Sequence, residues 1–268
     1  MSRSPTPKTG RCPTRPPDRG NVKLLGFVRA ALVLACAGAL LTAAQARGPA
    51  PAPTPVRAGA TTGATPREPV RIMPLGASST VGTGSASTAG YRGPLQQLMA
   101  AAGVPVELVG SQQDGPPTVP DRDHEGHAGW TMARMLPYVA GWVRAADPDV
   151  VLLHVGTNDL LQGVPAAVAA ERLDALLDTV HEASDAHVVV AGVWAPLPGR
   201  RVERAEFARR AAEVVAGHRA EGRAVSFADT GNLLDRAELS DGLHPNAEGY
   251  RRIAAMWVTQ IRAALRRP

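Results

Sequence analysis

The sequence predicts an α/β fold, a three-layer sandwich in which a central five-stranded parallel sheet lies between two layers of helices. Two observations support this prediction. Short apolar runs rich in β-branched residues alternate with segments of helical length, and the longer runs lack the polar alternation of a strand that is exposed on one face. Such runs are typical of strands buried on both faces, and their alternation with helices is typical of a parallel sheet covered on both sides.

The expected strands share this apolar, β-branched composition and lie at Val70–Leu75, Val106–Val109, Val150–Val155, His187–Val193 and Ala224–Phe227. The expected helices lie between and after them, at Tyr91–Ala102, Thr131–Ala146, Pro165–Ala183, Arg200–Gly222 and Asn246–Arg267. In the last helix, apolar residues recur every four positions, at Ile253, Trp257, Ile261 and Leu265. This spacing predicts one apolar stripe that packs on the sheet.

The first 46 residues have the composition of a secretory signal peptide. They contain seven Lys and Arg residues and one acidic residue, then an apolar run at Ala30–Leu41 and the small residues of Ala44–Ala46, a pattern suited to signal-peptidase cleavage. The apolar run is shorter than the roughly 18–20 residues needed to cross a bilayer. We therefore expect a secreted protein with no permanent membrane association. A lipoprotein signal at Val33–Cys36 is less favoured, because the residues after Cys36 stay hydrophobic instead of forming a polar tether.

A Pro/Ala-rich linker is expected at residues 47–68, followed by one domain at 69–268. Without the leader, basic and acidic residues nearly balance, so the high isoelectric point of the whole chain is no argument for nucleic-acid binding. Cys12 and Cys36 both lie in the leader. The exported protein is therefore expected to have neither a disulfide nor a thiol nucleophile.

Three short segments carry the residues of an ester-cleaving site: Gly76–Ser79, Gly156–Asp159 and Asp241–His244. In chain order they supply a hydroxyl, an amide and an imidazole next to an acid. The first two follow expected strands, and the third precedes the last helix. Because ligands bind beyond the carboxyl ends of the strands in a parallel sheet, we expect the three segments to meet at one edge.

Acyl transfer assigns a role to each of these side chains. Ser78 is the candidate nucleophile, His244 the base that removes its proton, and Asp241 the acid that orients the imidazole. Asn158 can donate to the oxyanion, and the backbone N–H groups of Gly129 and Ser78 are further candidate donors. No cofactor or metal is needed. Structural alternatives stay open: Ser78 can form a turn, Asp241 can cap the last helix, and Asn158 can form an Asx-turn.

The sequence resembles the SGNH (GDSL) hydrolase superfamily from about residue 70 to 260, nearly the whole expected domain. The superfamily's four blocks supply Ser, Gly, Asn and His, which match Ser78, Gly129, Asn158 and His244, with Asp241 as the usual acid. The resemblance implies a flavodoxin-like sandwich and a serine esterase. Lipase, phospholipase and general short-chain carboxylesterase activities remain alternatives within it.

One position departs from the superfamily pattern. Ala77 stands where the first block usually has Asp, a residue that mostly supports local hydrogen bonding. The departure concerns the geometry of the turn, and Ser79, one place along, remains an alternative nucleophile.

Further segments resemble carbohydrate esterase family 3, namely Arg71–Gly76, Tyr91-Arg92, Val109–Gln112 and above all Asp123–Thr131. The known activity of that family is the removal of acetyl groups from xylan. The resemblance therefore implies an acylated carbohydrate as the substrate. It also implies that His127 and Trp130, which lie in the last of these segments, contact that substrate.

A metal site is the main competing interpretation of the same segment. Two histidines and three acidic residues gather there, at Asp121, Asp123, His124, Glu125 and His127, and such sets can bind zinc or calcium. The segment has no helical periodicity that would place both imidazoles on one face, and the mechanism needs no ion. We therefore favour a polar loop that shapes the pocket.

Two motif matches are incomplete. Gly82-x-Gly84 follows a strand, but Ser87 occupies the third glycine position of a dinucleotide-binding loop. The segment that begins at Gly76 has Thr80 in its fifth position, so it does not complete the Gly-x-Ser-x-Gly elbow of an α/β-hydrolase.

A secreted carbohydrate-binding module is the non-enzymatic alternative. It would present Trp130, Trp142 and Trp194 as platforms for sugars. Only Trp130 lies in an expected site loop, whereas the other two occupy core positions of an expected helix and strand. This placement disfavours a stacking surface without an active site.

Overall fold

The structure is a computed structural model, and it describes residues 68–197 and 199–266. The predicted leader at 1–46 and the predicted linker up to residue 67 lie outside the described residues, as do Cys12 and Cys36. The assignment of these segments therefore stays a prediction.

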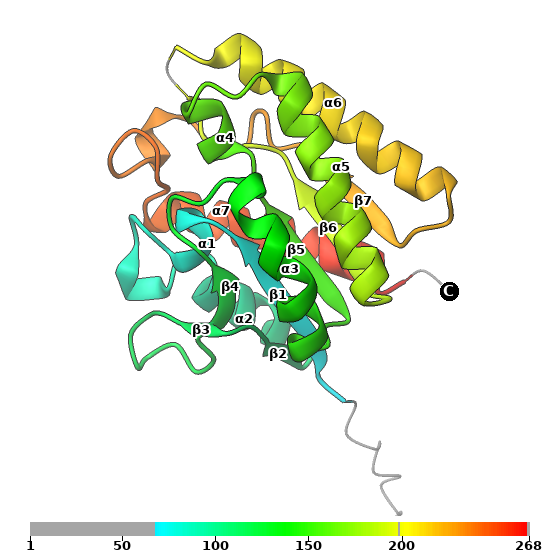
Figure 1. The fold of residues 1–268 in the computed structure, drawn as a ribbon. Helices are drawn as coiled ribbons and strands as arrows, with labels where there is room; N and C mark the ends of the chain where they lie inside the picture. Colours follow the sequence, from blue (N-terminus) through cyan, green and yellow to red (C-terminus); the bar gives the residue numbers. More distant parts are fainter. Residues whose placement is uncertain (1–67, 198, 267–268) are drawn as a thin grey trace, which may run out of the picture. The chain divides into compact units, whose positions relative to one another are not determined.

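A mostly parallel sheet forms the centre of the described domain (Figure 1). Its strands are β1 (Val70–Gly76), β2 (Val106–Leu108), β3 (Gln112–Gln113), β4 (Asp123–Gly126), β5 (Val150–His154), β6 (His187–Ala191) and β7 (Val225–Ala228). The order is β3-β4-β1-β5-β6-β7, and β2 pairs with the first half of β1, on residues Val70–Ile72. The predicted parallel strands are confirmed as β1, β2, β5, β6 and β7.

Strands β3 and β4 were not predicted. The expected polar loop at 123–126 is instead a strand, which pairs in parallel with the end of β1 and antiparallel with β3. His124 and Glu125 in β4 are buried, with 0% and 1% of their surface exposed. A buried strand made of polar residues has no apolar run to reveal it, because its side chains are satisfied by partners distant in sequence.

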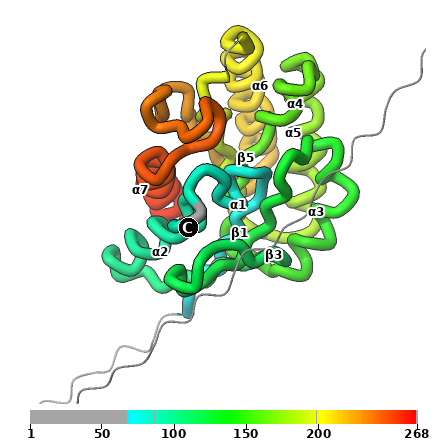
Figure 2. Tube along the Cα trace, turned by 90° about the vertical axis from the view of Figure 1, so that its left-hand side faces the viewer, coloured from blue at the N-terminus to red at the C-terminus, as the bar shows by residue number. Residues whose placement is uncertain are grey.

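Helices cover both faces of the sheet. They are α1 (Ser78–Val81), α2 (Arg92–Ala101), α3 (Met132–Ala146), α4 (Thr157–Leu161), α5 (Ala166–Ala183), α6 (Arg201–Ala220) and α7 (Ala247–Ala264). Figure 2 shows α2 and α7 on one side of β1 and β5, and α3 and α5 on the other. The five predicted helices are therefore confirmed, whereas the short helices α1 and α4 were not predicted. Among the described helices, none has the length and apolar character to cross a membrane.

The packing follows from the apolar pattern. Every residue of β5 is buried, as expected for a central strand covered on both faces. On α7, the predicted stripe is buried at Ile253, Trp257 and Ile261, each with 0% exposure. Leu265, the last member of the stripe, caps the helix and is only partly buried.

A buried cation holds the first turn after β1 in place. Arg92, at the start of α2, is fully buried, and its guanidinium donates hydrogen bonds to the backbone carbonyls of Thr80 and Val81 in α1. It also donates to the carbonyls of Asp114 and Arg122. A planar guanidinium with five N–H groups can satisfy several carbonyls at once. Arg92 therefore ties α1 to both ends of the loop that joins β3 to β4.

Candidate active site

The first site segment forms a tight turn between β1 and α1. Gly76 ends β1 beside His154, and a Cβ atom there would lie 2.5 Å from the carbonyl oxygen of His154 and 2.6 Å from Oγ1 of Thr80. No larger residue fits, so the turn requires glycine. Ser78 follows as the first residue of α1, and it is partly exposed. The strand end therefore presents the Ser78 hydroxyl at the carboxyl edge of the sheet.

The predicted nucleophile, base and acid lie in one hydrogen-bonded chain. Oγ of Ser78 is 2.9 Å from Nε2 of His244, and Nδ1 of His244 is 2.7 Å from Oδ2 of Asp241. The carboxylate can only accept, so the Nδ1 atom carries the proton and Nε2 is free to accept from the serine hydroxyl. Ser79, the alternative nucleophile, is buried and has no such bond to His244.

The loop that carries His244 is fixed at both ends. The Ser240 N–H donates to the His244 carbonyl at 2.8 Å, and Oδ1 of Asn246 accepts from two backbone N–H groups at the start of α7. Gly84 lies against the same loop, because a Cβ atom there would be 2.5 Å from the Pro245 carbonyl oxygen. The loop that carries the imidazole is therefore held by backbone contacts on one side and by the Asn246 N-cap of α7 on the other. Asn is one of the residues preferred at an N-cap.

Asp241 is ionised over the whole useful pH range. The backbone N–H of His244 donates to Oδ1 at 2.7 Å, and that of Leu243 at 3.0 Å. The hydrogen bonds from the backbone and side chain of His244 lower the pKa of Asp241 to about 2. The side chain is 51% exposed, so water screens the charge while these bonds fix its direction.

The predicted amide donor lies on α4. This short helix begins after Gly156, which has φ +96° and whose Cβ atom would lie 2.4 Å from the Phe207 ring, so glycine is required there. One N–H of the Asn158 side chain donates to the Trp130 carbonyl at 2.8 Å. An amide has two such hydrogens, and the second remains for a ligand.

Asp159, the neighbour of Asn158, anchors α4 to α3 and α5. The Asp159 carboxylate is 1% exposed, and it accepts from Met132 N–H at the start of α3 and from Arg172 of α5 at 2.8 Å. A carboxylate at a helix N-terminus also interacts favourably with the helix dipole. Sequence reasoning cited Asp159 only as part of a motif, because its partners are distant in the chain.

The remaining predicted residues lie in the turn that follows β4. The His127 N–H donates to the Gly76 carbonyl at 2.9 Å, which fixes this turn to the end of β1. Gly129 is exposed and has φ +78°. Trp130 lines the pocket at Ser78, whereas Gly129 and His127 do not, and His127 instead stacks on the Trp130 ring.

The pocket beside Ser78 has an empty volume of about 370 Å³, open solvent included. Besides the predicted residues, its lining includes His154 at the end of β5 and Trp194 just after β6. Their rings stack face to face, 3.3 Å apart, and burial lowers the pKa of His154 to about 3. Among the described residues, Nε2 of His154 has no hydrogen-bond partner. Trp194 is a core residue, as the sequence predicted, and it also lines the pocket. Sequence reasoning missed His154, although it follows the rule that sites lie at strand ends.

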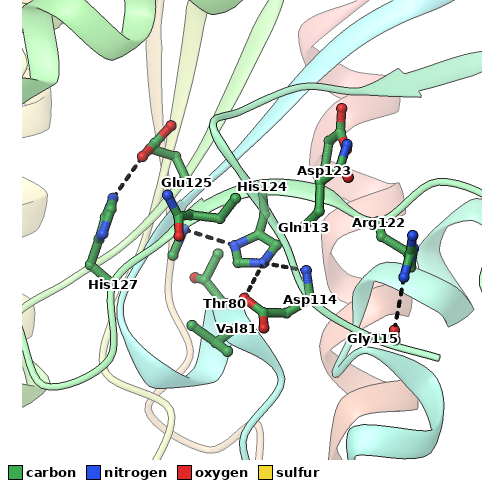
Figure 3. A network of polar contacts seen from close by, with 12 residues as sticks. Thr80, Val81, Gln113, Asp114, Gly115, Arg122, Asp123, His124, Glu125 and His127 are labelled. Carbon is green, nitrogen blue, oxygen red and sulfur yellow. Dashed lines mark hydrogen bonds and ion pairs between the residues drawn. The ribbon is translucent and has the colours of Figure 1, made fainter.

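The residues of the proposed metal cluster have other partners. Figure 3 shows the His124 imidazole beside Asp114, and the separate pair of His127 and Glu125. Burial, reinforced by the Arg92 and His127 charges, lowers the pKa of His124 to about 3. Nδ1 of the ring accepts from the Gly126 N–H at 2.9 Å, and Nε2 lies 3.3 Å from the backbone nitrogen and 3.2 Å from Oδ2 of Asp114. In residues 68–197 and 199–266, no three His, Cys, Asp or Glu side chains form a group that could hold a metal ion.

The fold and this site together define a serine hydrolase of the α/β sandwich type. Residues 75–252 match the GDSL-like lipase/acylhydrolase family, and the chain belongs to that family. The protein is a carboxylic ester hydrolase with the SGNH hydrolase fold.

Its relatives include carbohydrate esterases. The solved structure of a family 3 carbohydrate esterase of Clostridium thermocellum is 32% identical, with a TM-score of 0.67 over 74% of this chain and 98% of that one. A family 3 carbohydrate esterase from Talaromyces cellulolyticus, 24% identical, shares the fold, with a TM-score of 0.64 over 74% of this chain and 100% of that one. A multidomain esterase of Ruminococcus flavefaciens is 29% identical over 230 residues, which are 74% of this chain and only 29% of that longer protein.

We expect Asn158→Ala to lower kcat by roughly 10²–10³-fold, the effect of removing one oxyanion donor. Asn158 lines the same pocket as Ser78, and one of its two side-chain N–H groups is not needed for the bond to Trp130. Steady-state hydrolysis of 4-nitrophenyl acetate measures the change. Gln162→Ala, at the exposed end of the same helix, is the matched control and should keep wild-type turnover. Wild-type kcat in Asn158→Ala would exclude this side chain from the mechanism.

Proposed function

We propose that the protein removes acetyl groups from carbohydrate, with acetylated xylan as its substrate, through an acyl-enzyme formed on Ser78. The observation that carries this proposal is the hydrogen-bonded chain from Ser78 through His244 to Asp241 at the mouth of a small pocket. The similarity to a family 3 carbohydrate esterase supports the choice of substrate.

In the first half of the reaction, the Ser78 oxygen attacks the acetyl carbonyl carbon while its proton passes to Nε2 of His244. The carbonyl oxygen becomes negative, and the free N–H of Asn158 stabilises it, together with the backbone N–H of Ser78; Gly129, the third donor expected from the sequence, does not line this pocket. The C–O bond to the sugar then breaks. His244 gives its proton to the departing sugar oxygen, which leaves as a hydroxyl group.

In the second half, water takes the place of the sugar. His244 removes a proton from this water, whose oxygen attacks the acetyl group on Ser78. The bond to the serine oxygen breaks, that oxygen recovers a proton from His244, and acetate leaves. Asp241 keeps the same Nδ1–H tautomer of His244 through both halves.

The walls of the pocket favour a short acyl group. The stacked rings of His154 and Trp194 lie behind the nucleophile, and both side chains are nearly fully buried. A longer acyl chain would have to displace these close-packed rings, which is costly in a packed interior. An acetyl group needs no such change.

Acetate release from acetylated xylan tests the proposal, measured beside acetylated chitooligosaccharides, 4-nitrophenyl butyrate and phospholipid. We expect the highest kcat/KM among the natural esters on acetylated xylan, and lower values on the butyrate than on 4-nitrophenyl acetate. Turnover of phospholipid without turnover of acetylated carbohydrate would overturn the proposal in favour of a lipolytic activity.

We also propose that the protein acts outside the cell. The basic stretch, the short apolar run and the small residues within positions 1–46 support export. Expression in a secreting host, followed by N-terminal sequencing of the protein in the medium, tests this. An extracellular chain that begins near residue 47 is the expected result, and an uncleaved chain retained inside the cell would overturn it.

A further inference from the structure

Four aromatic side chains form a continuous strip beside the pocket: His127, Trp130, Tyr138 and Trp142. The His127 ring stacks on Trp142 with centroids 4.4 Å apart and on Trp130 at 4.5 Å. Tyr138 stacks on Trp142 at 5.6 Å and lies 5.6 Å from Trp130. Tyr138 and Trp142 are one turn apart on α3, so the helix presents both rings on one face. We call these four residues the aromatic strip.

A buried carboxylate holds the strip in position. Nε2 of His127 is 2.6 Å from Oε1 of Glu125, a side chain that is 1% exposed (Figure 3). Glu125 also accepts from the backbone N–H and the hydroxyl of Ser111. Burying a carboxylate is costly unless it is paired and hydrogen-bonded, and here it is both. The His127 ring is thus fixed, and it supports both indoles.

The strip is accessible and starts at the active site. Tyr138 is 52% exposed, Trp130 and Trp142 are partly exposed, and Ala128 and Gly129 beside them are exposed. Trp142 packs against the core, as its place in the sequence suggested, but its side chain is only partly buried. Trp130 belongs to both features, since its ring is in the strip and it lines the pocket at Ser78. A substrate that extends out of the pocket past Trp130 would meet Tyr138 and Trp142 next.

We propose that the aromatic strip binds the sugar units of the polysaccharide that neighbour the one carrying the ester. This inference rests on the proposed function. The pocket is small, so a polymeric substrate must lie mostly outside it. The Tyr138 ring, 52% exposed, offers a rigid, weakly hydrated face that suits the C–H faces of pyranose rings, and the two indoles stacked on His127 support it from beneath. Arg134, stacked 4.3 Å above the Trp130 ring, adds N–H donors for sugar hydroxyls at the edge of the strip.

The aromatic strip gives the enzyme a preference for long substrates. Assays with small esters do not detect this preference, because such esters do not reach the strip. We expect wild-type kcat/KM to rise with the length of acetylated xylooligosaccharides. In Tyr138→Ala, the ratio of kcat/KM for the longest oligosaccharide to that for 4-nitrophenyl acetate should fall by roughly tenfold, the upper range for one aromatic contact. Tyr138→Phe keeps the ring and should keep the ratio.

Leu98→Ala is the control, because Leu98 is 40% exposed on α2, in the other helix layer. Thermal unfolding and size-exclusion chromatography of every variant show whether the fold and the oligomeric state are unchanged. A wild-type enzyme indifferent to oligosaccharide length would overturn the role of the strip, as would equal ratios in Tyr138→Ala and Leu98→Ala. Conversion of a wild-type dimer to a monomer by Tyr138→Ala would overturn it in favour of a contact between copies.

Failure of the proposed function has a different signature. Hydrolysis of 4-nitrophenyl acetate without acetate release from any acetylated xylooligosaccharide would overturn the choice of substrate, and the strip's role with it. Turnover of those oligosaccharides without length dependence would leave the proposed function intact and remove only the strip.

Discussion

Ser78→Ala is expected to lower kcat for 4-nitrophenyl acetate by about 10⁶-fold, the effect of removing the nucleophile from a hydrolase triad. The alanine leaves His244 with no hydroxyl to deprotonate, and the acyl-enzyme cannot form. Thermal unfolding of the variant should stay close to that of the wild type, because Ser78 is partly exposed and its backbone starts α1 unchanged. Loss of activity with retained stability would assign the defect to chemistry.

Ser79→Ala is the natural comparison for that experiment. Ser79 is the next residue on the same turn and the other candidate nucleophile, but the hydrogen bond to His244 comes from Ser78. We expect Ser79→Ala to retain most of the wild-type activity. Inactivation of Ser79→Ala, with an active Ser78→Ala enzyme, would reverse the assignment. Mass spectrometry after reaction with an organophosphorus ester would locate the modified serine directly.

Asp241→Asn is expected to lower kcat by about 10⁴-fold, since an amide in place of the acid can stabilise the wrong tautomer of the histidine. The carboxylate accepts from Nδ1 of His244 at 2.7 Å, and an NH2 group there would leave Nδ1 as the acceptor and Nε2 protonated. A protonated Nε2 cannot remove the Ser78 proton. Steady-state and single-turnover kinetics on 4-nitrophenyl acetate measure the change, which should appear in acylation.

Glu248→Gln is the matched control for the loss of a carboxylate. Glu248 lies in the first turn of α7, is exposed, and pairs with Arg251 instead of with the site histidine. It should keep wild-type kcat. An Asp241→Asn enzyme with kcat within a few-fold of this control would show that backbone contacts alone orient His244, and the acid would lose its place in the mechanism.

The strands that could be predicted from the sequence are those whose buried residues are apolar. β5 is a continuous apolar run and β1 is apolar except for Arg71, so composition alone reveals both strands. β4 is as deeply buried, yet it consists of Asp123, His124, Glu125 and Gly126. Its stability depends on Asp114, Ser111 and the end of β1, and pairs of this kind leave no periodic signal in a single sequence.

The meeting of the site segments was predictable for a topological reason. Register pairs Gly76 with His154 and His154 with Ala191, so the ends of β1, β5 and β6 lie side by side. Residues just beyond these ends must therefore be neighbours. The supporting contacts were not predictable, because they depend on three-dimensional packing: Trp130 carbonyl with Asn158, Asp159 with Arg172, and the stack of His154 on Trp194. The stacking of Tyr138 and Trp142 of α3 with His127 and Trp130 was missed for the same reason.

The buried guanidinium of Arg92 couples the stability of the turn that carries Ser78 to the stability of the whole domain. Its four carbonyl partners come from α1 and from the two ends of the loop that joins β3 to β4, so α1 cannot loosen unless these contacts break together. Lysine, a point charge on a flexible stem, cannot reproduce this planar fork. On heating, catalysis and tertiary structure should consequently disappear in a single transition, without an intermediate in which the catalytic turn alone has melted.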